Sequence, residues 1–339
     1  MAARRGSLTP SVILMPLGAA KLGRFSRSGL RCASTPVSNG DPQPGDVIDG
    51  RYLLEREIGR GGHGVVYAST DQKTGARVAL KLLRQNIAED PQFAVRLERE
   101  AHSLQMLWDE SVVRVHSFGT DQEGSVFMVM ELLDGETLDD HLWDLEGFGD
   151  RMSAFEVLRC LDPVARALHT AHTKGIIHRD VKPANIFRIN PEAGGGVRLM
   201  DFGLVKIQGS EQLTQAGMIA GSPSYIAPEV WRCEAFDHRI DVYSLAAVTF
   251  RCLAGRAPFA APNPLELFMK AIKDERPKLT TFRPDLPPAV DAWVAQALAI
   301  DKDHRYGYVS TMWNDLLRIV MSGNTPSAEK ARATFRLPG

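Results

Sequence analysis

Apolar and polar residues alternate in the part of the chain that begins near residue 51, and a period of two is typical of β-strands with one buried face. Tight turns separate the first strands, and the clearest of them is DQKTG at residues 71–75. Strands joined by such turns are expected to form an antiparallel meander. The predicted strands cover residues 52–58, 64–70, 77–83 and 126–133.

Elsewhere apolar residues recur every three or four positions, which predicts helices. The first begins at Asp90-Pro91, where a capping side chain precedes a proline at the first helical position. After Asp134-Gly135 the pattern becomes mainly helical, so a β-rich part of about 80 residues precedes a larger helical part. Further helices are predicted over residues 154–173, 241–253, 264–273, 289–300 and 311–321.

The first 50 residues lack this patterning. Residues 34–49, STPVSNGDPQPGDVID, have the composition of a flexible linker, and the 40 residues at the start carry six basic side chains and no acidic one. Three interpretations of this leader stay open: a disordered tail, an organellar targeting segment, and a secretory signal, whose apolar run Pro16 would interrupt. We expect residues 1–50 to be a disordered leader and linker and residues 321–339 a short tail.

Composition places the chain among ordinary globular proteins, with 44% apolar and 24% charged residues in a length of 339. The formal net charge is −1, and without the leader it becomes −7, from 34 basic and 41 acidic side chains. That balance argues against a nucleic-acid-binding protein, whose phosphate contacts need an excess of basic groups. The longest apolar runs are shorter than the roughly 18 residues that span a bilayer, so no transmembrane anchor is predicted.

The four cysteines are scattered and form no CxxC pair or cluster with the spacing of zinc ligands. We therefore expect no structural metal and a reducing compartment, which indicates the cytoplasm unless the leader directs the chain to an organelle. Cys160 and Cys252 fall in apolar, helix-like stretches, where a small buried side chain is a better interpretation than a reactive thiol.

A glycine-rich segment, IGRGGHGVVY at residues 58–67, places Gly59, Gly61 and Gly64 in GxGxxG spacing. Glycines allow backbone N–H groups to approach phosphate oxygens because no side chain intervenes. A dinucleotide-binding fold needs a helix directly after the glycines, whereas the next residues here continue a strand. The segment is therefore predicted to be a flap over a mononucleotide.

Strand alternation places Ala79 and Lys81 on one face of the predicted strand, so the lysine would point into a cleft beside the glycine flap. A lysine in that place can bind phosphate. Glu100 lies on the apolar stripe of the predicted helix, three residues after Leu97. Because a carboxylate there is costly unless it is paired, Glu100 is the expected partner of Lys81.

The strongest chemical signal is HRDVKPAN at residues 178–185, followed by DFG at 201–203 and APE at 227–229. With the glycine-rich segment and VALK, these motifs resemble the eukaryotic-type protein kinase superfamily, specifically its bacterial Ser/Thr branch, over roughly residues 51–320. The resemblance implies an α+β, two-lobed protein kinase fold with ATP between the lobes. A small antiparallel β-rich N-lobe with one helix, residues 51–133, would precede a larger, mainly helical C-lobe, residues 134–320.

The resemblance also implies roles in transfer of the ATP γ-phosphoryl group to a protein Ser or Thr hydroxyl. Asp180 would orient and deprotonate the acceptor, and Lys182 would lie beside the γ-phosphate. Asn185 and Asp201 would bind two Mg²⁺ ions, since Mg²⁺ prefers oxygen ligands.

For ATP itself, Lys81, fixed by Glu100, would bind the α- and β-phosphates. Met130 would be the gatekeeper beside the purine, and Phe187 would form the floor of the pocket, where many members of the family have Leu. Backbone groups shortly after Met130 would hydrogen-bond the purine. The implied ATP-binding residues are Ile58, Gly59, Arg60, Gly61, Gly62, His63, Gly64, Val65, Val66, Ala79, Lys81, Glu131, Leu133, Asn185, Phe187 and Asp201.

Residues 204–226, between DFG and APE, resemble an activation segment. Thr214 is the first-choice phosphorylation site and Ser210 the second, while Ser222 stands where the family usually has Thr. Arg179 supplies a cation that a phosphate in this segment could engage.

Two structural roles follow from the same resemblance: Asp241 resembles a helix aspartate that steadies the catalytic loop, and Arg305 resembles an arginine that pairs with Glu229. We expect a Ser/Thr protein kinase that acts on protein substrates, phosphorylates its own activation segment through a transient homodimer, and has no nucleic-acid partner. Two alternatives stay open, an ATP-binding pseudokinase scaffold and a small-molecule phosphotransferase. Lys182, the APE motif and the long segment before it favour a peptide substrate over a small molecule.

Overall fold

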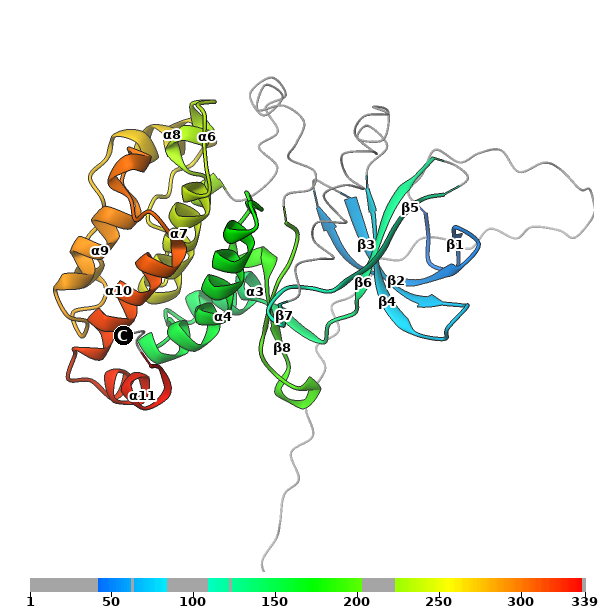
Figure 1. Ribbon diagram of the computed structural model, residues 1–339, viewed down its shortest axis with the longest axis horizontal. Helices are drawn as coiled ribbons and strands as arrows, with labels where there is room; N and C mark the ends of the chain where they lie inside the picture. The colour runs from blue at the N-terminus through cyan, green and yellow to red at the C-terminus, as the bar shows by residue number, and fades with distance from the viewer. Residues whose placement is uncertain (1–41, 62–63, 84–108, 122–123, 203–222, 337–339) are drawn as a thin grey trace, which may run out of the picture. The chain divides into compact units, whose positions relative to one another are not determined.

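The first part of the chain forms an antiparallel sheet of six strands. The computed structural model describes residues 42–61, 64–83, 109–121, 124–202 and 223–336. Strands in this sheet follow the order β1-β2-β3-β4-β6-β5, and neighbours are antiparallel (Figure 1). They are β1 (Val47–Ile48), β2 (Tyr52–Gly61), β3 (Gly64–Asp71), β4 (Arg77–Leu83), β5 (Val115–Thr120) and β6 (Val126–Glu131).

Four of the six strands agree closely with those predicted from the alternating pattern, whereas β1 and β5 are not predicted. β4 has the predicted bounds, β2 continues to Gly61, and β6 ends at Glu131, before the predicted end at residue 133. The helix predicted from Asp90 lies outside the described residues. The single N-lobe helix therefore stays a prediction.

The linker prediction is wrong at its end, because residues 47–48 form strand β1 and residues 42–46 hydrogen-bond to the sheet. Ile48 of β1 pairs with Tyr52 of β2, and its side chain is buried. The Tyr67 hydroxyl donates a hydrogen bond to the Pro42 carbonyl at 2.6 Å. A single buried isoleucine and a few backbone contacts hold this segment. Such contacts cannot be recognised from its composition, which is rich in Pro and Gly.

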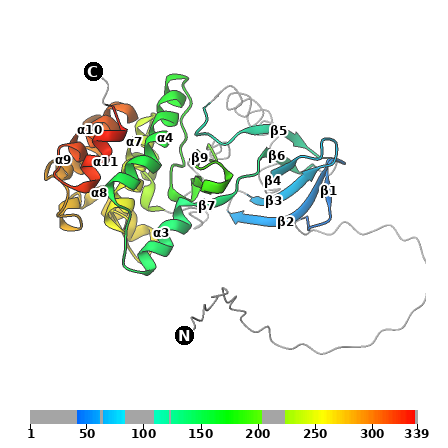
Figure 2. The same cartoon turned by 90° about the horizontal axis from the view of Figure 1, so that it is seen from below.

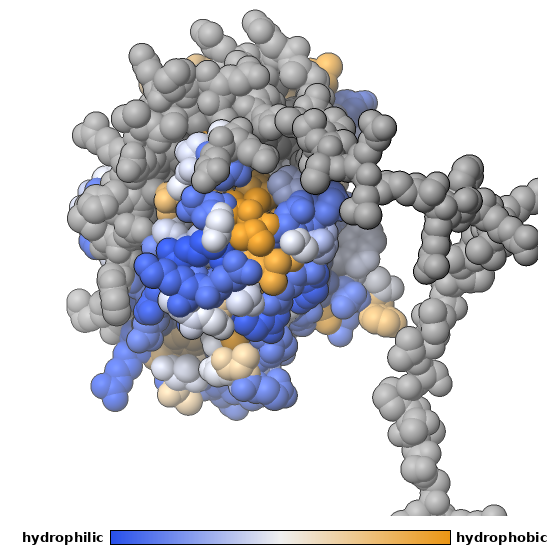
Figure 3. Space-filling view, turned by 90° about the vertical axis from the view of Figure 1, so that its right-hand side faces the viewer, coloured by the Kyte–Doolittle hydropathy of each residue, from blue (hydrophilic) through white to orange (hydrophobic). Residues whose placement is uncertain are grey.

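The two faces of the sheet carry separate apolar clusters, as the alternation predicts. Leu80 and Leu82 belong to a cluster on one face that also contains Phe127, whereas Ala79 belongs to a cluster on the other face. Lys81 shares the face of Ala79. Seen from the side of this sheet, the described surface is largely hydrophilic around one small apolar area (Figure 3).

The rest of the described chain is mainly helical, so the predicted α+β architecture is confirmed. Helices α4, α7 and α10 pack side by side, and β7, β8 and β9 form a small antiparallel sheet next to them (Figures 1 and 2). The α-helices are α3 (Leu138–Gly147), α4 (Ala154–Thr173), α6 (Pro228–Trp231), α7 (Arg239–Ala254), α8 (Pro264–Lys273), α9 (Ala289–Ala297), α10 (Val309–Met321) and α11 (Pro326–Thr334). The strands are β7 (Gly135–Thr137), β8 (Ile186–Ile189) and β9 (Val197–Leu199), and the 3₁₀ helices are η1 (Pro183–Asn185), η2 (Pro191–Ala193), η3 (Pro223–Tyr225), η4 (Leu279–Thr281) and η5 (Lys302–His304).

Local sequence explains why two helices begin where they are predicted to begin. Ahead of α4, the Ser153 hydroxyl accepts from the Glu156 N–H and the Glu156 carboxylate accepts from the Ser153 N–H, which is a capping box. Ahead of α8, Asn263 accepts from the Glu266 N–H, and Pro264 takes the first helical position. Both helices have their predicted bounds.

Three of the described α-helices, α3, α6 and α11, are not predicted by the sequence pattern, and α6 is a short one. α3 contains several acidic residues, and only Leu138 and Leu142 of it are buried. α11 lies in the predicted short tail and buries two small residues, Ala328 and Ala331. Alanines give a weak hydrophobic pattern, so this helix cannot be recognised from the periodicity.

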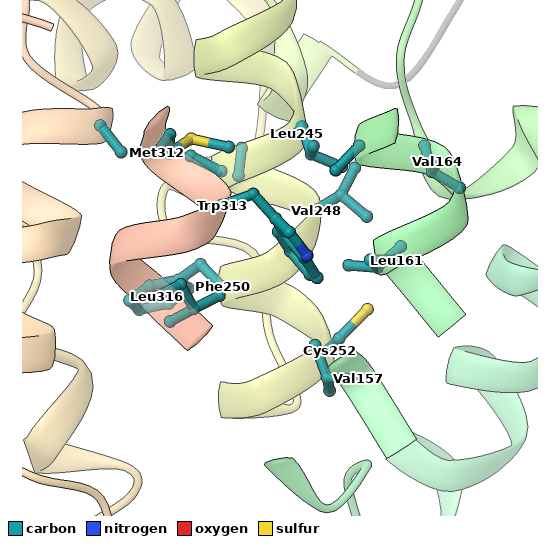
Figure 4. Packing of buried hydrophobic residues seen from close by; sticks show 14 of the residues in the cluster. Val157, Leu161, Val164, Leu245, Val248, Phe250, Cys252, Met312, Trp313 and Leu316 are labelled. Carbon is teal, nitrogen blue, oxygen red and sulfur yellow. The ribbon is translucent and has the colours of Figure 1, made fainter. Parts of the chain in front are cut away.

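The helical core is closed around Trp313 of α10, which lies between α4 and α7 (Figure 4). Its indole N–H donates to Asp162 at 2.8 Å, so the buried polar atom has a partner. Cys160 and Cys252 are buried as predicted, and burial raises the pKa of the Cys160 thiol to about 11. The apolar side chains that surround the indole include Leu161, Val164, Leu245 and Val248.

No helix in the described part of the chain is both long enough and apolar enough to cross a membrane.

Replacement of Leu245 by Ala tests this packing, because the side chain is fully buried in the core. We expect Leu245→Ala to lower the free energy of unfolding by about 2–5 kcal/mol through lost apolar contact and the cavity left behind. The matched control is Leu265→Ala, since Leu265 is 70% exposed on α8 and its removal should change stability by less than about 0.5 kcal/mol. Chemical denaturation followed by circular dichroism measures both, and equal effects would contradict the assigned core.

Candidate active site

Lys81 and Asp201 form an ion pair between the N-terminal sheet and the helical part of the chain. Lys81 lies in β4 and is 7% exposed, and its Nζ is 2.7 Å from Asp201 Oδ1. A buried ammonium is costly unless a carboxylate neutralises it, so the contact stabilises both charges. The two parts also meet beside this pair, where the Val113 N–H donates to the Leu199 carbonyl of β9.

The sequence predicts Glu100 as the partner of Lys81, and Glu100 lies outside the described residues. That pairing stays a prediction, and the described partner is Asp201. The backbone of Asp201 is in the left-handed region, with φ of 52°, which costs a residue other than glycine about 1 kcal/mol. The bond from Lys81 helps to hold the carboxylate in this conformation.

Asp241, in the first turn of α7, holds the loop that contains the HRD motif. Its Oδ2 accepts from the His178 N–H and from His172 Nε2, both at 2.8 Å, and its Oδ1 accepts from the Arg179 N–H at 2.9 Å. Burial disfavours the charged carboxylate, but the hydrogen bonds from His172 and from the backbone keep the pKa of Asp241 below its ordinary value. Arg179 has a φ of 65°, so the carboxylate stabilises a sharp turn. The predicted role of Asp241 is confirmed.

His178 connects this loop to the segment that carries Asp201. Its Nε2 is 2.9 Å from the Met200 carbonyl, and its Nδ1 accepts from the Asp180 N–H at 3.2 Å. One ring nitrogen therefore donates and the other accepts, which is the neutral form. Burial lowers the pKa of His178, in agreement with that form. No role of His178 is predicted from the sequence, although its place directly before Arg179 and Asp180 is a signal that points to one.

Asp180 is oriented by two side chains that follow it in the same loop. Lys182 Nζ donates to Asp180 Oδ2 at 2.8 Å, and Asn185 Nδ2 donates to the same oxygen at 3.0 Å. Asn185 Nδ2 also donates to the Asp180 carbonyl at 2.8 Å, at the end of η1. Three predicted site residues are therefore brought together in one hydrogen-bonded turn.

The chain continues from this turn to the Lys81–Asp201 pair. The carbonyl of Asn185 accepts from the N–H of Met200, the residue directly before Asp201, at 2.8 Å. The two groups of predicted residues are thus joined by a short backbone connection. Their arrangement fits one site rather than two.

The glycine-rich segment forms the hairpin between β2 and β3. Gly61 pairs with Gly64 across the strands, and Gly62 and His63 lie outside the described residues. Gly64 has a φ of 147°, and a Cβ on it would lie 1.9 Å from the Leu82 carbonyl oxygen, so no other residue fits there. The described members of the predicted flap lie in these two strands and are Ile58, Gly59, Arg60, Gly61, Gly64, Val65, Val66 and Tyr67.

One apolar cluster contains several residues predicted to line the adenine pocket. Ala79 and Met130 are buried in it, and Val66 and Leu133 pack against it. The Glu131 N–H donates to the Arg114 carbonyl, so Glu131 could hydrogen-bond a purine only by accepting at its own carbonyl. The cluster also includes Val113, Met128 and Met200, which sequence reasoning does not identify because they are distant in the chain.

Two predicted pocket residues lie apart from this cluster. Ile58 of β2 is 38% exposed, and Phe187 of β8 is half-buried opposite Thr137 of β7. Neither belongs to the cluster formed by the described residues of this face. Their roles as roof and floor of the pocket stay predictions.

The residues present fit a divalent cation that is bound together with phosphate. Asn185 uses its amide NH₂ group to donate to Asp180, which leaves an amide oxygen as a ligand, and Asp201 supplies a carboxylate. Mg²⁺ is usually bound by one or two carboxylates together with substrate phosphates and water. No cluster of three or more His, Cys, Asp or Glu side chains suited to a metal occurs among the described residues. A cation here would therefore depend on the phosphates of a substrate for part of its coordination.

Glu229 and Arg305 form the buried ion pair that the sequence predicts. The two terminal guanidinium nitrogens of Arg305 donate to the two carboxylate oxygens of Glu229, each at 2.6 Å. This bidentate contact fixes the end of the APE motif to the loop before α10. The predicted phosphorylation sites Thr214, Ser210 and Ser222 lie outside the described residues.

Comparisons of the chain with known proteins agree on one family. The chain matches the protein kinase domain over residues 52–317. It is 38% identical to the serine/threonine-protein kinase PknA of Mycobacterium tuberculosis over 269 residues, which is 78% of this chain and 60% of PknA. It is 34% identical to the serine/threonine-protein kinase PknL of the same organism over 298 residues, which is 88% of this chain and 71% of PknL.

Solved structures agree with this family. The crystal structure of the Mycobacterium tuberculosis PknI kinase domain superimposes with a TM-score of 0.65 and 29% identity, and the match covers 82% of this chain and 99% of that domain. The chain spans about 60% of the length of PknA.

Replacement of Asp241 by Asn tests the network around the HRD loop. The substituted side chain would have one oxygen and one NH₂ group where Asp241 has two oxygens, so the N–H of either His178 or Arg179 would lose its acceptor. We therefore expect the free energy of unfolding to fall by about 3 kcal/mol. Because the folded pKa of Asp241 is lowered, the wild-type advantage should be complete above about pH 4 and decline as the pH falls toward that lower value.

Asp303→Asn is the matched control, since Asp303 is an exposed surface partner of Arg239 and its loss should cost less than about 1 kcal/mol. Denaturant titrations at a series of pH values provide the measurement. An Asp241→Asn protein as stable as the control would show that the carboxylate does not hold the loop.

Proposed function

This chain belongs to the protein kinase family, and we propose that it transfers the γ-phosphoryl group of ATP to Ser or Thr hydroxyls of proteins with the help of Mg²⁺. The observation that carries the proposal is the single site formed by the Lys81–Asp201 ion pair and the hydrogen-bonded turn from Asp180 to Asn185. An amine, two oxygen ligands for a cation and a carboxylate are the groups that phosphoryl transfer requires.

Asp180 is proposed to bind the acceptor hydroxyl. Lys182 and Asn185 both donate to its Oδ2, so the carboxylate is oriented before a substrate arrives. In the transfer, the hydroxyl oxygen forms a bond to the γ-phosphorus, the bond from that phosphorus to the leaving oxygen of ADP breaks, and the hydroxyl proton passes to Asp180. His178 positions this residue through the hydrogen bond from the Asp180 N–H.

Positive charge around the triphosphate is proposed to come from this chain's lysines and from the cation. Lys81 would bind the α- and β-phosphates, and Lys182 would lie beside the γ-phosphate. Asn185 and Asp201 would hold Mg²⁺, which supplies charge neutralisation at the phosphates when it is bound. The buried position of Lys81 supports this role, because charge interactions are stronger away from water.

A protein acceptor is proposed from two sources of support. Lys182 follows Asp180 by two residues, which resembles the Ser/Thr-specific pattern. The relatives PknA and PknL are named as serine/threonine-protein kinases. A small-molecule acceptor has no comparable support.

Regulation by autophosphorylation is part of the proposal. Thr214 would be the first site and Ser210 the second, and two copies of the chain would meet transiently for the transfer. Arg179, whose backbone is held by Asp241, would engage the phosphate. We also propose a cytoplasmic setting, in keeping with the buried Cys160 and Cys252 thiols.

The test is phosphate incorporation by wild-type chain and by Asp180→Asn. We expect the wild type, incubated with Mg-ATP, to gain the mass of one or more phosphoryl groups and to label a generic basic protein. Asp180→Asn should reduce both rates by about a hundredfold or more with little effect on ATP binding, because it removes the proton acceptor and leaves Lys81 and Asp201 in place. Intact-mass spectrometry and peptide mapping provide the readout, with a phosphate expected at Thr214.

Asp303→Asn serves as the control for an Asp to Asn change on the surface and should keep wild-type rates. If the wild-type chain binds ATP but neither it nor Asp303→Asn transfers phosphate, the result would support a pseudokinase instead. Transfer to an aminoglycoside but not to protein would identify a small-molecule phosphotransferase. A wild-type chain that gains no phosphate within residues 204–226 would rule out the regulatory part alone.

A further inference from the structure

One face of α3 presents two large aromatic side chains to solvent. Trp143 is 74% exposed, and Phe148, directly after the last helical residue, is 91% exposed. The opposite face of the same helix packs into the core through Leu138 and Leu142. Aromatic side chains gain much from burial, and they are enriched where proteins bind one another. Two of them uncovered on one short helix therefore point to a partner.

Helical geometry places acidic groups between these two rings. Positions 140, 143, 144, 147 and 148 fall on one side of a helix with 3.6 residues per turn. Trp143 and Phe148 stand at the two margins of this stripe, with Asp140 and Asp144 exposed between them and Gly147 adding no side chain. We call these five residues the α3 outer face.

The charge around the α3 outer face is strongly negative. Residues 132–150 contain seven acidic residues and no Lys or Arg. Arg188 binds Glu136, and Arg251 binds Asp139 and Glu146, so three of the seven are neutralised from other elements. Among the described residues, no Lys or Arg forms an ion pair with Asp140 or Asp144.

The α3 outer face begins next to the candidate active site. β7, which leads into α3, pairs with β8, and β8 follows Asn185 directly in the chain. α3 also contacts η1, which ends at Asn185. The helix extends about 15 Å from this point, at 1.5 Å per residue. A peptide bound along it would lie close enough to the site for another part of the same substrate to reach Asp180.

We propose that the α3 outer face binds a segment of the protein substrate in which Lys or Arg residues alternate with large apolar residues. Basic groups would meet Asp140 and Asp144, and apolar side chains would cover Trp143 and Phe148. This inference rests on the proposed function and extends it, since it names a substrate class by a contact outside the acceptor site. Charge complementarity and the uncovered rings select this occupant.

Direct binding tests the surface without any catalysis. The probe is a fluorescein-labelled short peptide of alternating Arg and Leu that lacks Ser, Thr and Tyr, titrated with the full chain in the absence of ATP and followed by fluorescence anisotropy. A matched peptide carries Glu in place of each Arg. We expect the basic peptide to bind, the acidic peptide not to bind, and affinity to fall as salt is raised.

Two variants with matched controls locate the contact. Trp143→Ala should weaken binding of the basic peptide roughly tenfold, as truncation of a central interface aromatic does. Asp144→Asn should weaken it by a few-fold and reduce its salt dependence. Leu265→Ala removes an exposed apolar side chain from α8, and Asp303→Asn removes an exposed carboxylate near η5, and both should bind like the wild type. All four changes are on the surface, and circular dichroism checks that the fold is kept.

Several outcomes would overturn the proposal. Equal affinity for the basic and acidic peptides would do so. An equal loss of affinity for the basic peptide in Trp143→Ala and Leu265→Ala would also do so. If binding of the basic peptide depends on salt but not on Trp143, it reflects general charge attraction and not the α3 outer face. Self-association of the wild-type chain that Trp143→Ala abolishes, seen in sedimentation, would make this face a contact between copies instead.

A kinetic comparison separates this inference from the proposed function. Two acceptor peptides are used, one alone and one joined to the basic segment by a glycine-alanine linker. We expect the joined peptide to have a roughly tenfold lower KM with unchanged kcat, and Trp143→Ala to remove that difference while leaving the simple peptide unaffected. If the basic peptide binds but no acceptor is phosphorylated, the docking surface is supported and the kinase activity is refuted. If both acceptor peptides are phosphorylated with the same KM, the kinase activity is supported and the docking surface is refuted.

Discussion

The buried ion pair between Lys81 and Asp201 is the contact on which the candidate site depends. It joins β4 of the N-terminal sheet to the segment after β9, at a point where an isolated ammonium could not be buried without large cost. The same two side chains are suited to phosphate and to a divalent cation. Neutralisation of one by the other therefore keeps two opposite charges together at the junction of the sheet and the helical part.

A second set of contacts fixes the groups that would carry out the chemistry. Asp241 is buried and accepts backbone N–H groups from His178 and Arg179, and His178 in turn orients the backbone of Asp180 and contacts the carbonyl before Asp201. The backbone N–H groups of His178, Arg179 and Asp180 each meet an acceptor, and such pairing favours a rigid loop. The fold thus positions Asp180 through groups that never need to touch a substrate.

Much of the fold and of the candidate site can be predicted from the sequence, where the information is local. The starts of α4 and α8 follow from Ser153 and from Asn263 with Pro264, and the strand alternation places Lys81 on the same face as Ala79, as predicted. α3 and α11 escape prediction because charged residues and alanines give little periodic signal. The contact of Lys81 with Asp201 and the roles of His172 and His178 depend on residues far apart in the chain, so spacing alone cannot identify them.

The central claim is that Lys81, held at Asp201, binds the phosphates of ATP. Calorimetric titration of Mg-ATP and of adenosine into the full chain and into Lys81→Met tests it most directly, since methionine keeps much of the side chain's volume and removes its charge. The account predicts that affinity for Mg-ATP falls at least about tenfold while affinity for adenosine is unchanged. Equal affinity of both proteins for Mg-ATP would contradict it.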